Sequence, residues 1–452
     1  MTQDMTTGNP LSLLVRFSIP LLLGTLFQQL YNLVDTVIVG RYLGITALTA
    51  VGATSSINYM VMGFVTGICS GFAIPVAQEF GAKEYENMRR FVANASYLAA
   101  MFAALMTLFT VVFCKRMFLL VKTPMDILGD SCGYMVIVFA GLPFTFLYNI
   151  TAGIIRALGD SKTPFYFLAV ATMLNIALDF LFILKFHMGV EGAAYATVLA
   201  QSVAGLACYF YMKKKYEILR LKTGERKVSR AYLWKLTMLG VPLGLQSSIT
   251  AIGSVLLQGA VNTLEMTCVS AYTVLTKIKQ FTICPYGALD IAMATYTGQN
   301  YGARCYDRIK QGIKAGTLIY GIYSVVMAVL LTFWGDNIAL IFVDASETEV
   351  LNHVKLFFQC CGVFYLVIIV LNSLRSVIQG LGYGVASMLA GVCELAARSL
   401  IALFLVPIFG YLAVCFTDAA AWILAGGCVL VMYLHIWKKI TKEWEEQEKT
   451  AK

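Results

Sequence analysis

Acidic side chains occur inside long apolar runs of this chain, at spacings that place them beside other polar groups. In the first run, the polar residues Thr25, Gln28, Asn32 and Asp35 recur at spacings of three, four and three. These spacings put the four side chains on one face of a helix. An ionised group is costly in apolar surroundings, so Asp35 is a candidate functional residue. The alternative is that the stripe makes only interhelical hydrogen bonds.

Two later runs add compatible oxygen atoms. Asn175 and Asp179 are four residues apart and share a helix face, and Thr197 lies in the next run. Carboxylate, amide and hydroxyl oxygens are the ligands that a hard cation such as Na+ prefers, and two carboxylates in one pocket can share a proton instead. We predict one site for Na+ or H+, made by Asp35, Asn175, Asp179 and Thr197. The alternative is that each acid bonds separately to a helix backbone.

The elements that position these groups are membrane-spanning helices. Of the 452 residues, 59% are hydrophobic and only 13% are charged, which excludes an ordinary soluble domain. The apolar runs are too long and continuous for a porin-like barrel, so an all-α polytopic membrane protein remains. The length has room for about twelve transmembrane helices, and hydropathy places six on each side of a basic central stretch; the fourth is expected at Tyr134 to Ile155.

An internal repeat divides the chain into two halves. The segment Ala77 to Lys83 recurs as Gly298 to Arg304 at a shift of 221 positions, and Ile19-Pro20-Leu21 matches Val241-Pro242-Leu243 at 222. Six helices in each half make this a parallel repeat, related by a pseudo-twofold axis along the membrane normal, with a cavity between the halves that opens alternately. The expected divisions are an N-lobe at 1–212, a cytoplasmic linker at 213–232, a C-lobe at 233–437 and a cytoplasmic tail at 438–452.

The second half carries different polar groups from the first. The position related to Asp35 falls near Leu257 or Gln258, where no acid occurs. Glu394 and Arg398 are four residues apart, which favours an internal ion pair. Asp290 and Asp418 are open between contact with a bound small molecule and buried pairing. The candidate cavity residues are therefore Gln28, Asn32, Gln246, Gln258, Asp290 and Asp418.

The charge distribution predicts the topology. There are 34 basic and 25 acidic residues, a formal net charge of +9, but the basic residues gather in connections and do not indicate a nucleic-acid partner. Lys213 to Arg230 and the basic residues after Lys438 should be cytoplasmic, whereas Gly335 to Val350, which is acidic, should face outward. We expect a multi-pass protein of the cell membrane, inner or plasma, with both termini in the cytoplasm.

The sequence lacks motifs for nucleotide binding and for a metal site. No G-x-x-x-x-G-K-[ST] loop occurs, so the chain has no nucleotide-driven motor of its own, and an ion gradient or a partner must supply energy. The three histidines are too scattered for a metal site. We expect no cofactor other than the coupling ion.

Several motifs together resemble the multidrug and toxic compound extrusion (MATE) family of prokaryotes. They are Leu30 to Asp35 with Gly40, Ile74-Pro75 with Gln78 to Gly81, Arg156 to Asp160 with Pro164, and Gly298 to Ala303. The resemblance implies two six-helix lobes and export of cationic or amphipathic compounds in exchange for Na+ or H+. It also implies an N-lobe ion site, whose residues match Asp35, Asn175, Asp179 and Thr197. Acids that some members carry in the seventh and tenth helices are absent here.

The expected function is a secondary active exporter, an antiporter of drugs and toxic organic compounds, that works as a monomer and is not an enzyme. Its partners would be organic cations or amphiphiles and membrane lipid. One alternative is a flippase for lipid-linked saccharides, which a strongly basic cavity would favour. Another is a membrane-embedded transferase, but Asn175-x-x-x-Asp179 lacks the repeated Asp clusters that such enzymes use.

Topology can be tested by cysteine labelling. We expect single Lys222→Cys and Ser346→Cys substitutions, in a variant lacking native cysteines, to react from opposite faces of the membrane. Ser346→Cys should react with an impermeant maleimide in intact cells. Reaction of both positions from one face would contradict cytoplasmic termini and an even number of spans.

Overall fold

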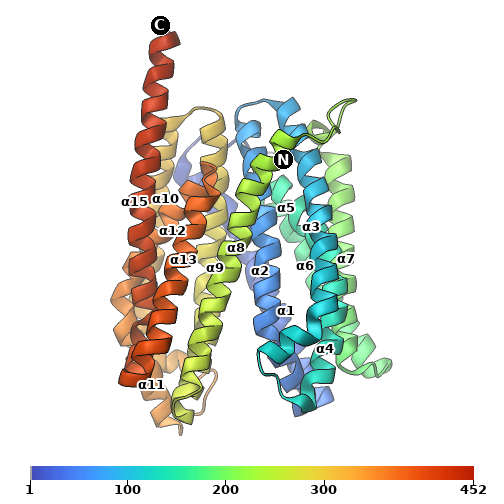
Figure 1. Ribbon diagram of the computed structural model, residues 1–452, viewed down its shortest axis with the longest axis vertical. Helices are drawn as coiled ribbons and strands as arrows, with labels where there is room; N and C mark the ends of the chain where they lie inside the picture. The colour runs from blue at the N-terminus through green and yellow to red at the C-terminus, as the bar shows by residue number, and fades with distance from the viewer. Residues whose placement is uncertain (1–2, 452) are drawn as a thin grey trace. The chain divides into compact units, whose positions relative to one another are not determined.

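The computed structural model describes residues 3–451, which form helices joined by short connections and include no β-strand (Figure 1). The backbone of a long apolar run satisfies its own hydrogen bonds only as a helix when no water is present, which accounts for the all-α architecture. The chain forms two compact units. Unit 1 comprises Met1–Gly8, Val15–Gly244 and Gly298–Cys305, and unit 2 comprises Asn9–Leu14, Leu245–Thr297 and Tyr306–Lys452.

The first repeat contains seven α-helices and a π-helix, followed by a 3-10 turn. These are α1 (Pro10–Leu43), α2 (Ile45–Gly81), α3 (Tyr85–Leu120), α4 (Met125–Ala140), α5 (Leu142–Ala157), α6 (Lys162–Asp179), η1 (Phe180–Lys185), α7 (Gly189–Lys215) and η2 (Glu217–Leu219). The second repeat contains α8 (Arg230–Val261), α9 (Met266–Gly302), α10 (Tyr306–Ala339), α11 (Thr348–Cys361), η3 (Gly362–Phe364), α12 (Tyr365–Gly380), α13 (Gly384–Leu400), η4 (Ile401–Leu405), α14 (Val406–Phe409) and α15 (Tyr411–Ala451).

The helices agree with a twelve-span bundle. Among the described residues, ten helices are long and apolar enough to cross a membrane, or eleven if the bent pair α4 and α5 is one span. The polar helix α9 is not among them, although its 37 residues exceed the roughly 20 that a span needs. Counting α9 by its length gives the predicted twelve.

The fourth span differs from the expected helix at Tyr134 to Ile155 in where it begins, and Pro143, which could kink this run, lies beside a break in it. It begins at Met125 and breaks between α4 and α5 with a bend of 46°. Gly141 lies at the break. A glycine is favoured there because the Cβ of any other residue would come within 2.5 Å of the Val198 side chain. Pro143 follows in the first turn of α5, where a missing N–H is tolerated. Hydropathy does not register such a bend, since both halves are apolar.

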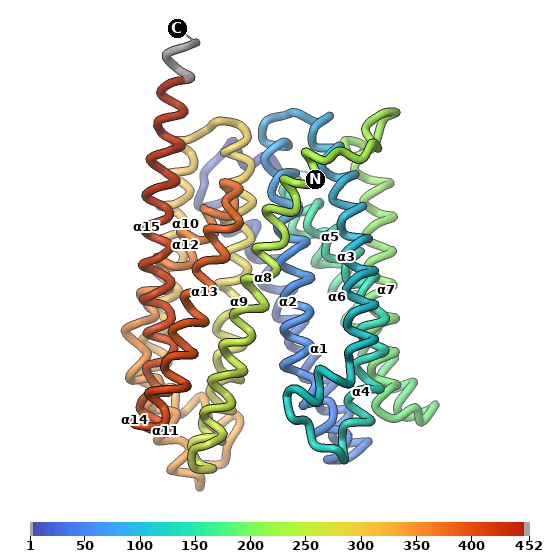
Figure 2. The backbone as a smooth tube through the Cα atoms, viewed as in Figure 1, coloured from blue at the N-terminus to red at the C-terminus, as the bar shows by residue number. Residues whose placement is uncertain are grey.

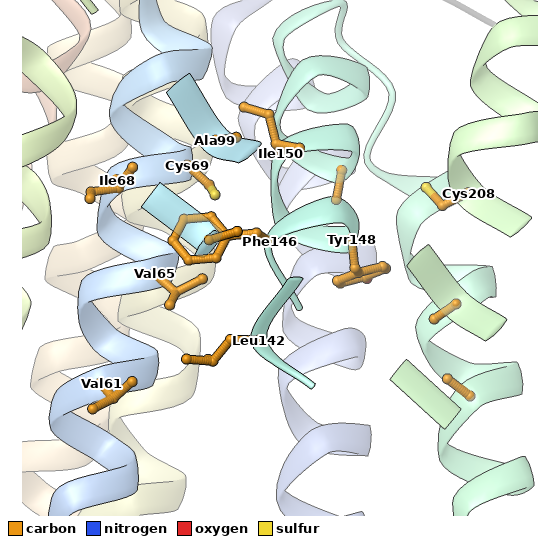
Figure 3. Close-up of a cluster of buried hydrophobic side chains, with 14 of the residues drawn as sticks. Val61, Val65, Ile68, Cys69, Ala99, Leu142, Phe146, Tyr148, Ile150 and Cys208 are labelled. Carbon is orange, nitrogen blue, oxygen red and sulfur yellow. The ribbon is translucent and has the colours of Figure 1, made fainter. Parts of the chain in front are cut away.

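Unit 1 has a continuous apolar core. Figure 3 shows Val65 and Cys69 of α2 lying against Phe146 of α5, and these side chains are at most 1% exposed. Close packing continues between α2 and the first part of α8. A Cβ at Gly67 would lie 2.5 Å from the carbonyl oxygen of Leu243, so only glycine allows this approach.

The connection between the repeats, whose path Figure 2 traces, is hydrogen-bonded to α3. Arg89 donates two hydrogen bonds to the Glu225 carboxylate, from Nε to Oε2 and from Nη2 to Oε1, each 2.7 Å long, and both residues are buried. These bonds from Arg89 lower the pKa of Glu225 to about 2, so the carboxylate stays ionised at neutral pH. Farther along α3, Tyr97 donates to the carbonyl of Arg226 at 3.1 Å.

The ends of the two repeat-related helices α2 and α9 cross within unit 1. A Cβ at Gly81 would overlap the carbonyl oxygen of Gln299, and one at Gly302 would overlap that of Gln78. Gln299 also accepts from the N–H of Met5 and donates to the carbonyl of Ala157, both at 2.8 Å. The recurring motif of the two halves is thus a reciprocal backbone crossing.

We expect Gly302→Ala to lower the thermal unfolding midpoint of the detergent-solubilised protein, because the new methyl group must displace backbone. The cost should be about 1–3 kcal/mol, as for other overpacked sites. Gly287→Ala is the matched control on α9, since a Cβ there meets nothing within 4 Å. Equal midpoints for the two variants would contradict the crossing.

Candidate functional site

The two helices of the first repeat that carry acids bury them. Asp35 of α1 is 6% exposed, and Asp179, the last residue of α6, is fully buried. Upstream in the α1 stripe, Gln28 and Asn32 are exposed, so the stripe runs from the surface of unit 1 to a buried carboxylate. Asp35 lies one helical turn from Tyr31 on α1, which places both side chains on the same side of that helix.

Asp160 fixes the start of the helix that presents Asp179. Its Oδ1 accepts from the N–H groups of Lys162 and Thr163 at 2.9 and 3.0 Å, which satisfies two free donors in the first turn of α6. Its Oδ2 accepts from the Tyr216 hydroxyl at 2.6 Å. One carboxylate therefore joins α6 to the end of α7.

Asn175 connects Asp179 to α7. In the amide orientation that satisfies both neighbours, the Asn175 Nδ2 donates to Asp179 Oδ2 at 3.2 Å and its Oδ1 accepts from the backbone N–H of Thr197 at 3.2 Å. The Thr197 hydroxyl lies 3.2 Å from that of Tyr31 on α1. Thus α1, α6 and α7 each contribute to one polar cluster inside an apolar unit.

Buried acceptor oxygens in this cluster have no donor. Asp35 Oδ1, Asp179 Oδ1 and Gln201 Oε1 are inaccessible and have no hydrogen-bond partner among the described residues. Neither carboxylate forms a salt bridge within the part of the chain described. An unpartnered buried acceptor costs free energy that a bound cation or proton would recover. The donor set therefore fits Na+ or H+.

A pocket in unit 1 leads to the cluster. It is lined by Gln28, Tyr31, Leu168, Ala171, Thr172, Asn175, Thr197, Ala200 and Gln201. The polar members Tyr31, Thr172 and Gln201 were not among the residues predicted from the sequence. Each lies three or four residues from a predicted site residue, so helical spacing was the available signal.

The remaining candidates lie in unit 2, and none of them lines this pocket. Gln246 is buried, and its Oε1 accepts from the Ser387 hydroxyl at 2.7 Å and from Gln379 at 3.4 Å. Gln258 is near the surface and donates to Asn262 at 2.8 Å. Gln246 thus pairs internally, whereas Gln258 stays accessible.

Asp290 and Asp418 belong to a chain of buried and partly buried charges in unit 2. The pairs are Lys279–Asp418, Arg398–Asp418 (3.6 Å), Arg398–Glu394 (3.5 Å), Arg375–Glu394 (3.4 Å) and Arg375–Asp290 (3.5 Å). The predicted pair of Glu394 and Arg398 is confirmed. Lys279 and Arg375 were missed, although both are basic residues inside apolar runs. The six formal charges sum to zero.

Comparison with known proteins places the chain in a family. The family model described as MatE matches residues 20–181 and 242–412, one segment in each repeat. The chain belongs to the MatE family. This is the MATE family that the sequence motifs resemble, so that prediction is confirmed, and the chain is a membrane transport protein.

Curated relatives and solved MATE structures agree with this assignment. The chain is 31% identical over 344 residues to the probable multidrug resistance protein YoeA of Bacillus subtilis, covering 75% of this chain and 74% of that one. It is 33% identical to YpnP of the same organism, covering 66% and 67%. The fold matches a MATE structure in the bent conformation with a TM-score of 0.89, at 21% identity, over 97% and 98% of the two chains. A multidrug resistance MATE transporter in an outward-facing conformation gives a TM-score of 0.88 at 21% identity, with the same coverage.

In this MATE protein, we expect Asp418→Asn to destabilise unit 2, because Lys279 then keeps no carboxylate partner. Breaking a buried pair from one side costs about 3–5 kcal/mol. The double variant Lys279→Met with Asp418→Asn should recover most of that loss, which thermal unfolding would measure.

The matched control is Asp336→Asn, which breaks a partly exposed pair with Lys355 (2.9 Å). It should cost at most about 1 kcal/mol, the usual value for a surface pair. An Asp418→Asn midpoint as high as that of this control would show that the buried network does not stabilise unit 2.

Proposed function

We propose that this MATE protein is a secondary active exporter of cationic or amphipathic drugs and toxic compounds. Inward movement of Na+ or H+ down its gradient would drive the outward movement of the cargo. The observation that carries the proposal is the pair of buried carboxylates in unit 1 with unpartnered oxygens. Relatives support the cargo class: YoeA is named a probable multidrug resistance protein, and MepA of Staphylococcus aureus, 22% identical to this chain, is named a multidrug export protein.

The coupling ion would bind where charge is uncompensated. Asp35 and Asp179 supply carboxylate oxygens, and Asn175 and Thr197 complete the shell through amide and hydroxyl groups. Occupancy changes the free energy of burying the two acids, so it changes the relative stability of conformations that bury them differently. A ligand shifts such an equilibrium only through its preference for one state, and this preference is what would couple the gradient to alternating access.

Cargo would first meet the uncharged polar surface. Gln28 and Asn32 in unit 1 and Gln258 in unit 2 are the accessible candidates. Asp290 and Asp418 remain part of the proposed cavity set, but both are engaged in ion pairs, so cargo contact there requires a pair to open. The names of the relatives favour drug export over lipid-linked saccharide flipping.

The rest of the proposal concerns the topology, the oligomeric state and the cofactor. Both termini lie in the cytoplasm, and the lobes divide at the 213–232 linker. The protein acts as a monomer, catalyses no covalent reaction and uses no cofactor beyond the coupling ion.

The coupling site is tested by removing one titratable charge at a time. We expect Asp35→Asn and Asp179→Asn to fold but to lose ion-driven export of ethidium from proteoliposomes, because an amide neither takes up a proton nor balances Na+. Imposed Na+ and pH gradients, applied separately, identify the ion. Asp130→Asn, at an exposed position of α4, is the matched control and should export normally.

Normal gradient-dependent export by both Asp35→Asn and Asp179→Asn would overturn the site assignment. In that case Asp290 and Asp418 would be the next carboxylates to replace.

A further inference from the structure

Helix α9 carries a polar sector centred on one lysine. Ser270, Thr273, Lys277 and Gln280 are spaced three, four and three residues apart and therefore share a helix face. Thr273, Lys277 and Gln280 are exposed on unit 2, and Ser270 is partly buried. The same three-four-three spacing of polar residues marks the α1 stripe of unit 1. Unlike that stripe, the α9 sector presents a positive charge at the surface of its unit.

Two lysines of α9 have opposite surroundings. Lys279 is largely buried and pairs with Asp418 in the charge network. Lys277, two residues earlier and pointing to another side, is exposed and has no hydrogen-bond or ion-pair partner among the described residues. Because the network already sums to zero charge without Lys277, this ammonium group is not needed for internal neutrality.

Lys277 does not lie at an end of α9, where a lysine would reach the membrane interface. Helix α9 has 37 residues and is about 55 Å long, and Lys277, eleven residues from its start, lies ~17 Å along it. A hydrocarbon core of about 30 Å centred on the helix would include this depth. Four polar groups on one face are unfavourable against lipid, which favours contact of this face with water or with a polar ligand.

The repeat shows that the scaffold does not require the charge. At a shift of 221 positions, the sector corresponds to Thr49, Gly52, Ser56 and Tyr59 of α2, which are also exposed. The α2 residues are uncharged, and α2 is apolar enough to count as a span where α9 is not. The polar face is thus common to both repeats, and Lys277 is a feature specific to the second.

We propose that Lys277 binds an anionic group on the cargo, so that the exporter accepts amphiphiles bearing a carboxylate, sulfonate or phosphate. This rests on the proposed export function and narrows its cargo class. The ammonium group would pair with the anion through charge-assisted hydrogen bonds, while the apolar body of the cargo would lie against apolar side chains nearby.

The test compares two dyes that differ only in this charge. A rhodamine with a free carboxylate and its methyl ester are each offered to proteoliposomes under an imposed ion gradient, and KM and kcat are measured. We expect the wild type to have the lower KM for the free acid. Lys277→Gln should raise that KM roughly tenfold, the effect of losing one charge-assisted hydrogen bond, without changing the KM of the ester.

Lys277→Arg should retain the preference for the free acid, since it keeps the positive charge. Lys310→Gln removes the same charge at an exposed position and should leave both dyes unchanged. A wild type without preference for the free acid, or a Lys277→Gln variant that handles both dyes with the wild-type ratio, would overturn the inference while leaving export intact. Failure of the wild type to move either dye under the gradient would overturn the export proposal and this inference with it.

Discussion

A charged side chain in a membrane-spanning bundle needs a partner, because neither lipid nor packed apolar side chains can solvate it. The charge network of unit 2 meets this constraint internally: three basic and three acidic side chains form one connected series from Lys279 to Asp290. Unit 1 does not, since Asp35 and Asp179 keep unpartnered oxygens within the described structure. The proposed difference in function follows from this contrast: the charge network of unit 2 is neutral by itself, whereas the acidic cluster of unit 1 is stabilised by a bound ion.

The two repeats share a backbone plan but differ in chemistry. A π-helix follows α6 at Phe180–Lys185, and another follows α13 at Ile401–Leu405, 221 positions later. Such segments often occur at functional sites, and the first one begins directly after Asp179. The residue related to Asp179 is Leu400, while the residue related to Thr197 is Asp418. Both repeats therefore keep the π-helix, but the side chains beside it differ between them.

Much of the fold was predictable because helical spacing and hydropathy act within one segment. The twelve spans, the repeat and the shared face of Asn175 and Asp179 all follow from such local patterns. Contacts between helices do not: spacing could not show that Tyr31 lies against Thr197, nor that Arg375 bridges two acids from other helices. Pro143 marked this run as one that could kink, but the break at Gly141 depends on the approach of Val198 from α7, which spacing does not show.

The crossing of α2 and α9 has a consequence for biosynthesis. Unit 1 includes Gly298–Cys305, and the side chain of Gln299 supplies hydrogen bonds to Met5 and Ala157. These partners are synthesised long before Gln299, so the first repeat enters the membrane with those backbone groups still unsatisfied. Unit 1 can complete its packing only after residue 305 has left the ribosome. Its folding therefore ends after its own helices have been inserted, and it depends on synthesis of the first helices of the second repeat.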